Sequence, residues 1–129
     1  MGIADAAHEE ITPGASHLVI SKLACSLVGT SESITIRPGT RTYNAYGRIQ
    51  SVEQFRCSYG LAPSYQQQII AGALEVTAVG PDGEVRAIEL RDHPFFVATL
   101  FLPQLSSSSG RSHPLIVAFL SAAAELTKP

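Results

Sequence analysis

The sequence predicts an α/β fold in which a mixed sheet carries flanking helices and a β-hairpin. Strand-like and helix-like segments alternate along the chain without internal repeats. Two strand-like segments, 75–79 and 84–90, flank Pro81-Asp82-Gly83. Proline presets one dihedral angle of a turn and glycine accepts a positive φ, so a hairpin is expected there. An apolar segment that begins with a proline, 114–126, indicates a helix near the carboxy terminus.

The amino-terminal half predicts three strands followed by a helix. Residues 17–23 are apolar-rich, and residues 33–37 alternate in polarity until Pro38 and Gly39 end the pattern. Residues 55–59 are expected to form a third strand. Ser64 is expected to cap a helix over residues 65–74. The side chains expected to face inward from this helix are those of Ile69, Ile70, Ala73 and Leu74.

The carboxy-terminal part predicts a strand, a loop and the last helix. Residues 95–101 are continuously apolar, which is typical of a buried strand, and the serine-rich residues 106–111 indicate a mobile loop. Ser112 or His113 would cap the final helix with Pro114 at its first position. We expect this helix to pack on the sheet.

Composition indicates one domain and excludes several classes of partner. A chain of 129 residues that is 45% hydrophobic is sufficient for one core. The net charge is −2 and the basic residues are scattered, which argues against binding to nucleic acid. No apolar run approaches the roughly 20 residues of a membrane-spanning helix, so no membrane association is expected. The amino terminus lacks the pattern of a signal peptide, and a cytoplasmic location is therefore expected.

The cysteines and histidines predict neither a metal site nor a cofactor. Two cysteines, Cys25 and Cys57, are too few for a disulfide scaffold and lack the spacing of zinc ligands. The four histidines also lack ligand spacing such as i, i+4 on a helix.

The segment His93-Pro-Phe-Phe-Val-Ala-Thr-Leu-Phe-Leu-Pro-Gln104 resembles the closing motif of class I glutamine amidotransferases, and most closely that of CTP synthases. In that family a late His and Glu complete a Cys-His-Glu triad, and the matching positions here hold Leu102 and Gln104. Leucine has no proton to exchange, and a neutral amide does not orient an imidazole as a carboxylate does. The resemblance therefore implies a degenerate triad. We interpret Leu102 as a core side chain that fills the place of the imidazole.

Residues 52–65 are similar to the CTP synthase segment that helps to hold glutamine, and they retain its Arg56 and Tyr59. The second arginine of that segment falls on Ser58. The resemblance thus implies a small-molecule cleft at Arg56, Ser58 and Tyr59. Residues 80–94 match the family's Pro-Asp-Gly hairpin and Asp-His-Pro connection, and the resemblance also suggests a short helix between residues 40 and 47 that Gly47 ends.

The resemblance implies that residues 1–129 form one domain that corresponds to the later part of a class I amidotransferase (flavodoxin-like) domain. The Gly-x-Cys-x-Gly elbow, which carries the nucleophile in the family's early half, does not occur in this sequence. We therefore expect either that the chain has been cut from a longer protein or that it pairs with a second polypeptide, another copy or a different subunit.

Cys57 stands where the family has a histidine, beside Arg56 on the predicted strand. A cationic neighbour lowers the pKa of a thiol, so Cys57 is a candidate reactive thiol, although a small buried side chain is the alternative. Cys25 follows an apolar run, and we expect it to be buried and less reactive than Cys57.

Two classes of function remain open. The first is a catalytically degenerate amidotransferase-like protein with a binding or regulatory role, which would not hydrolyse glutamine. The second is an enzyme, either a fragment of an active amidotransferase or a thiol-based redox enzyme that uses Cys57.

Overall fold

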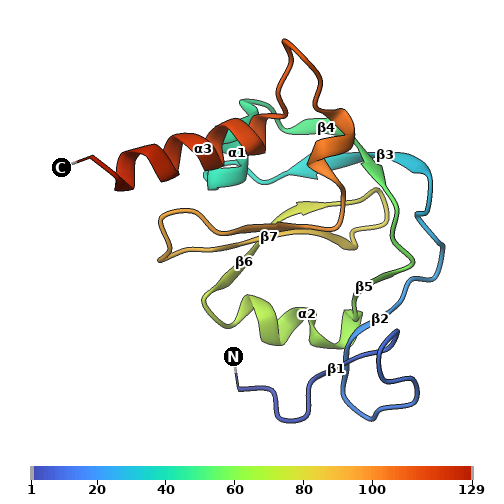
Figure 1. Ribbon diagram of the computed structural model, residues 1–129. Helices are drawn as coiled ribbons and strands as arrows, with labels where there is room; N and C mark the ends of the chain where they lie inside the picture. Colours follow the sequence, from blue (N-terminus) through green and yellow to red (C-terminus); the bar gives the residue numbers. More distant parts are fainter. Residues whose placement is uncertain (1, 129) are drawn as a thin grey trace.

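The computed structural model describes residues 2–128 and divides the strands between two sheets, shown in Figure 1. The larger sheet has the order β4-β3-β6-β7-β8 and is antiparallel throughout. The smaller sheet has the order β1-β2-β5, with β1 parallel and β5 antiparallel to β2. The strands are β1 Ala7–His8, β2 Leu18–Lys22, β3 Thr30–Ile36, β4 Gln50–Phe55, β5 Tyr59–Leu61, β6 Leu74–Val79, β7 Val85–Leu90 and β8 Val97–Thr99.

Helices flank the hairpin on both sides, as the predicted α/β class requires. They are α1 Arg41–Tyr46, α2 Pro63–Ile70, α3 Pro114–Leu126 and the 3-10 helix η1 Pro103–Ser106. Figure 1 shows α1 and α3 on one side of β6 and β7 and α2 on the other. None of the helices in residues 2–128 is long and apolar enough to cross a lipid bilayer.

The predicted hairpin is confirmed by β6 and β7 and the turn between them. Gly83 has φ 82° and donates its N–H to the Gly80 carbonyl at 3.0 Å. The buried guanidinium of Arg86 follows this turn and donates through Nε to Glu32 on β3 at 2.8 Å. Burial alone would lower the pKa of Arg86, but hydrogen bonds to Glu32 and Glu84 and the charge of Glu32 outweigh burial and raise that pKa. The ion pair joins the hairpin to the neighbouring strand.

The predicted short helix is confirmed as α1, and it ends at Gly47 as expected, while its amino-terminal cap is Thr40. The hydroxyl of Thr40 accepts the Tyr43 N–H at 3.0 Å, and Gly47 ends the helix at φ 65°. The buried carboxylate of Glu89 on β7 accepts the N–H groups of Arg41 and Thr42, each at 3.1 Å. A negative charge at a helix amino terminus is favourable, so α1 is held against the sheet.

The core lies between the larger sheet and the helices α1 and α3. Along β3, Ile34 and Ile36 are fully buried. The alternate residues Ser33 and Thr35 are exposed, which is the period-two alternation expected of a strand. The buried hydrophobic cluster consists of Leu27, Ile34, Ile36, Phe55, Ala78, Ala87, Phe101 and Leu115.

The predicted strand over residues 55–59 is wrong, because the chain leaves one sheet and enters the other within it. β4 ends at Phe55 and β5 begins at Tyr59. The carbonyls of Cys57 and Ser58 instead accept N–H groups from Leu27 at 2.9 Å and Leu23 at 2.8 Å. These bonds to a distant segment replace the ladder that a continuous strand would form.

The predicted helix over residues 65–74 begins and ends earlier than expected. α2 starts at Pro63 with Ala62 rather than Ser64 in the capping position, because proline at the first position has no N–H to satisfy. It ends at Ile70, which is 42% exposed, and Leu74 already belongs to β6. Of the expected inward set within the helix, only Ile69 is buried.

The carboxy-terminal elements differ from the expectation in extent. Only Val97–Thr99 of residues 95–101 is strand, and Phe96 is 42% exposed. The serine-rich segment 106–111 begins at the last residue of η1. Within it, the backbone of Ser108 pairs with that of Arg111. α3 is capped by His113 as predicted, and it packs against α1 as well as contributing Leu115 to the core.

Candidate functional site

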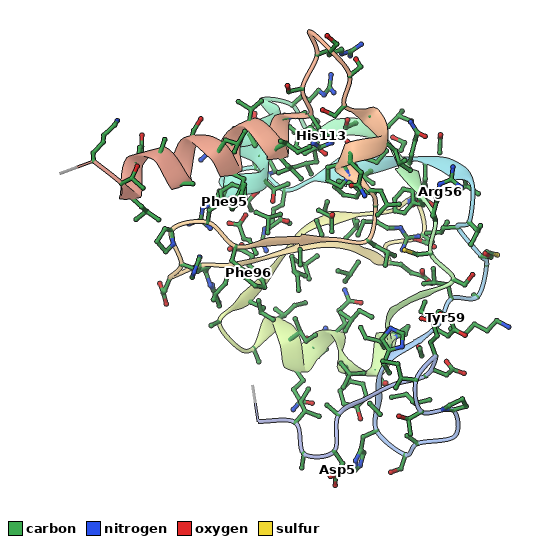
Figure 2. The ribbon with its side chains drawn as sticks, in the orientation of Figure 1. Asp5, Arg56, Tyr59, Phe95, Phe96 and His113 are labelled. Atoms are coloured by element: carbon green, nitrogen blue, oxygen red, sulfur yellow. The ribbon has the colours of Figure 1, made fainter. Side chains whose placement is uncertain are left out.

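The segment between β4 and β5 borders a cleft of about 500 Å³ where the two sheets approach each other. Arg56, Cys57, Ser58 and Tyr59 all line it, so the structure brings the predicted binding residues together. Figure 2 shows Arg56 and Tyr59 on the same side of the molecule. The remaining lining residues are His8, Glu10, Ile20, Val28, Gly60, Leu61 and Leu100.

Polar side chains from the β4–β5 connection and from the smaller sheet meet in the cleft. Arg56 is exposed and forms no ion pair with any residue that the structure describes. The ring of Tyr59 lies 5.5 Å from that of His8, which comes from β1. The Ser58 hydroxyl is 3.0 Å from the Ser26 hydroxyl. A cationic guanidinium, a phenol and hydroxyl groups can together hold a small polar molecule.

The two cysteines differ from the sequence prediction in their exposure. Cys25 is exposed rather than buried, because residues 24–26 lie outside the hydrogen bonds that Leu23 and Leu27 make with the β4–β5 connection. Cys57 is half-buried, and its thiol donates to the Leu100 carbonyl at 3.3 Å.

Leu102 and Gln104 lie outside the residues that line the cleft. Leu102 is half-buried rather than a fully buried core residue, because the chain turns there into helix η1, none of whose residues is buried. Its N–H donates to the Gln54 carbonyl of β4 at 3.0 Å. Gln104 is exposed on η1. The assignment of these two residues to the triad positions stays a prediction.

A buried polar cluster beside the cleft was not predicted from the sequence. Glu53 of β4 and His113 at the start of α3 are 2% and 3% exposed, and His113 Nε2 is 3.2 Å from each carboxylate oxygen of Glu53. The Tyr46 hydroxyl of α1 donates to Glu53 at 2.6 Å. His113 Nδ1 accepts the Leu115 N–H at 3.2 Å, so we assign the imidazole proton to Nε2, which donates to Glu53.

The electrostatics of this cluster keep Glu53 ionised. Burial alone would raise the pKa of the Glu53 carboxyl, but hydrogen bonds from His113, Tyr46 and Ser51 bring the pKa below its ordinary value. Burial, with the hydrogen bond to Glu53 and its charge, raises the pKa of Tyr46 far above its ordinary value. The side chains of the cluster are occupied with one another, so we assign it a structural role.

The sequence contains a signal for part of this cluster. Ser51, Glu53 and Phe55 share the inward face of β4 because strand side chains alternate between faces. The partnership of Glu53 with His113 has no local signal, since sixty residues separate them. His8 in the cleft was likewise missed because its position depends on the pairing of β1 with β2.

Comparison with known proteins places this geometry in context. No family model matches the chain. It is 33% identical over 97% of its length to CTP synthase of Chloroflexus aurantiacus and 34% identical over 95% to CTP synthase of Caldivirga maquilingensis. The chain spans only 25% and 24% of those two relatives.

Solved structures agree in fold. The glutaminase domain of Trypanosoma brucei CTP synthase with bound acivicin matches 96% of the chain with a TM-score of 0.88 and 24% identity, and 52% of that domain is covered. A Thermoplasma acidophilum protein described as part of a putative GMP synthase matches 83% of the chain with a TM-score of 0.61 and 14% identity, and 49% of that protein is covered. The chain is thus related to CTP synthase and has the fold of the class I glutamine amidotransferase domain of that enzyme.

Proposed function

We propose that this chain is a catalytically degenerate relative of the CTP synthase glutaminase domain that binds a small molecule in the cleft at Arg56, Ser58 and Tyr59. The observation that carries the proposal is a contrast between two parts of the chain. The cleft is formed and its arginine is unpaired among the described residues, whereas the sequence resemblance assigns Leu102 and Gln104 to the positions where a triad would need His and Glu. A chain that keeps the cleft but lacks the triad would have a binding or regulatory role.

The first test is an assay for glutamate release from glutamine by the purified chain. Loss of a triad member typically costs a factor on the order of 10⁴ in rate, so we expect no turnover above the rate without protein. Turnover comparable to that of ordinary amidotransferases would contradict the proposal and the assignment of Leu102 and Gln104.

The second test measures binding by isothermal titration calorimetry or NMR with L-glutamine as the probe. Binding to the cleft should weaken in Arg56→Gln and should be unchanged in Arg91→Gln, a matched variant of another exposed arginine. Equal affinity of both variants would show that Arg56 does not hold the probe. If the unaltered chain does not bind L-glutamine, the ligand of the cleft is not a glutamine-like molecule.

The alternative is that the chain supplies half of an active domain. An apolar hollow of about 340 Å³ between β8 and α3 favours it, with Phe96 and Phe119 42% and 53% exposed. The solved glutaminase domain is about twice as long as this chain, and we propose that polypeptide equivalent to the unmatched part covers this face. Co-purification with a polypeptide that carries a Gly-x-Cys-x-Gly elbow, with glutaminase activity of that complex, would favour the alternative.

The thiol-based redox alternative has less support from the site. Cys57 is half-buried and its S–H is committed to the Leu100 carbonyl, whereas a reactive thiol is accessible and ionised. Its test is the comparison of thiol reactivities described in the Discussion.

A further inference from the structure

A second polar pocket lies at the start of β4, apart from the cleft described above. It has a volume of about 420 Å³ and shares no lining residue with that cleft. It is lined by Ser33, Arg48, Gln50, Ser51, Val52 and Arg111. The lining therefore contains two guanidinium groups, two hydroxyls and an amide, and it contains no carboxylate.

Hydrogen bonds hold the side chain of Arg48 and the backbone of Arg111. Arg48 follows Gly47, which ends α1, and its Nη2 donates to the Ser51 hydroxyl at 3.1 Å. Arg111 exchanges two backbone hydrogen bonds with Ser108, each 3.0 Å long. Positioned donors lose less conformational entropy on binding than donors on a free loop.

Neither guanidinium group of the pocket has a carboxylate partner among the residues that the structure describes. Among the ion pairs of residues 2–128, none involves Arg48 or Arg111, whereas Arg37 pairs with Glu75 and Arg86 with carboxylates around the hairpin. The carboxylate next to Ser51 along the inner face is that of Glu53, which is buried and faces Tyr46 and His113. A chain of net charge −2 thus presents two free cations in one hollow.

We propose that this pocket binds a phosphate group, with Arg48 and Arg111 on its oxygens. The planar guanidinium matches two oxygens of a phosphate at once, and hydroxyl and amide donors complete such sites. Gln50 and Ser33 provide those donors in the pocket. Val52, which is 65% exposed, offers an apolar surface for the remainder of a phosphomonoester. The volume falls within the range of about 300–1,000 Å³ that is usual for small-molecule sites.

The experiment is an NMR titration of the ¹⁵N-labelled chain at constant ionic strength with inorganic phosphate, phenyl phosphate and acetate. Saturable shifts should centre on residues 48–52 and 111 for both phosphates and be weaker for acetate. Arg48→Gln and Arg111→Gln should each weaken phosphate binding about five-fold, as expected for the loss of one exposed ion pair. Tighter binding of phenyl phosphate would identify an ester as the ligand, and equal binding would identify free phosphate.

Two control variants separate this site from general attraction of anions. Arg37→Gln removes an exposed arginine that already has a carboxylate partner, and Arg91→Gln removes an exposed arginine whose Nη2 donates to the Gly72 carbonyl at 2.9 Å. Both controls should bind phosphate as the unaltered chain does. Absence of saturable shifts, shifts centred elsewhere, or equal losses in the control variants would overturn the proposal. Because Arg56 is not in this pocket, these outcomes are independent of the test of the proposed function.

Discussion

Replacement of His113 by alanine should destabilise the fold more than any ordinary surface substitution. The imidazole caps α3 through its Nδ1 and donates through Nε2 to the buried carboxylate of Glu53. Loss of a helix cap costs about 1 kcal/mol, and loss of a hydrogen bond to a charged group costs about 1.5–3 kcal/mol. We expect the free energy of unfolding to fall by about 3 kcal/mol, a large part of the roughly 5–15 kcal/mol that stabilises a typical domain.

The sequence supplies a matched control in His93. Like His113 it precedes a proline, and its Nδ1 accepts the N–H two residues later, that of Phe95, at 3.2 Å. His93 is exposed and has no buried carboxylate partner among the residues that the structure describes. His93→Ala therefore removes the same local hydrogen bond without the buried one. Its effect should be no more than about 1 kcal/mol.

The assay is urea denaturation of both variants followed by far-UV circular dichroism at neutral pH. The m-value should be unchanged, so that the midpoint reports the free energy of unfolding. A difference of less than about 1 kcal/mol between His113→Ala and His93→Ala would refute the role assigned to the His113–Glu53 contact.

Three further predictions concern other parts of the fold. The pKa of Glu53 is lowered in the folded state, so ionised Glu53 stabilises the fold above its unfolded-state pKa, and this stabilisation is lost as pH falls through its folded-state pKa. In Glu53→Gln the free energy of unfolding should therefore fall less steeply with acidification, as measured by urea denaturation from neutral to acidic pH. Gly80→Ala places a methyl carbon 2.9 Å from Nε of the buried Arg86, and we expect a loss of about 1–3 kcal/mol in thermal or urea unfolding. Cys25 is exposed and Cys57 is half-buried, so Cys57→Ser, which leaves only Cys25, should be alkylated faster than Cys25→Ser; the opposite order would revive the redox alternative.

Local signals predicted those parts of the fold that local interactions determine. The hairpin follows from the turn at Pro81-Asp82-Gly83, the end of α1 from Gly47, and the start of α3 from Pro114 with Ser112 or His113 as its cap. Each of these signals acts over three or four residues, through a dihedral preference or a cap. Nothing far away in the chain competes with them.

The sequence prediction failed where distant backbone decides the structure. Residues 55–59 have strand-like composition, but Cys57 and Ser58 pair with the segment around Leu23 and Leu27 and bend the chain between the sheets. The same segment leaves Cys25 exposed although an apolar run precedes it. Contacts between residues about thirty positions apart have no periodic pattern, and composition alone does not locate them.

The sequence predicted only part of the candidate site, because only some of its residues are neighbours in the chain. Arg56 to Tyr59 are contiguous in sequence, so a resemblance that covers this segment brings all of them to one cleft. His8 reaches the cleft only through the pairing of β1 with β2. Glu53 is a charged residue on a strand, and charged residues are almost never fully buried unless they are paired, so its burial depends on His113 from a different element.

The structure also explains how the chain tolerates Leu102 and Gln104 at the positions assigned to the triad. The contact that Leu102 makes with β4 uses its backbone N–H and the Gln54 carbonyl, and the Gln54 amide donates to the Leu105 carbonyl at 3.2 Å. Both bonds are independent of the side chains at 102 and 104. Segment 102–105 therefore remains attached to β4, whose end leads directly into Arg56 and the cleft. A loss of triad chemistry at these positions would leave the binding segment in place, which is the combination that the proposed function requires.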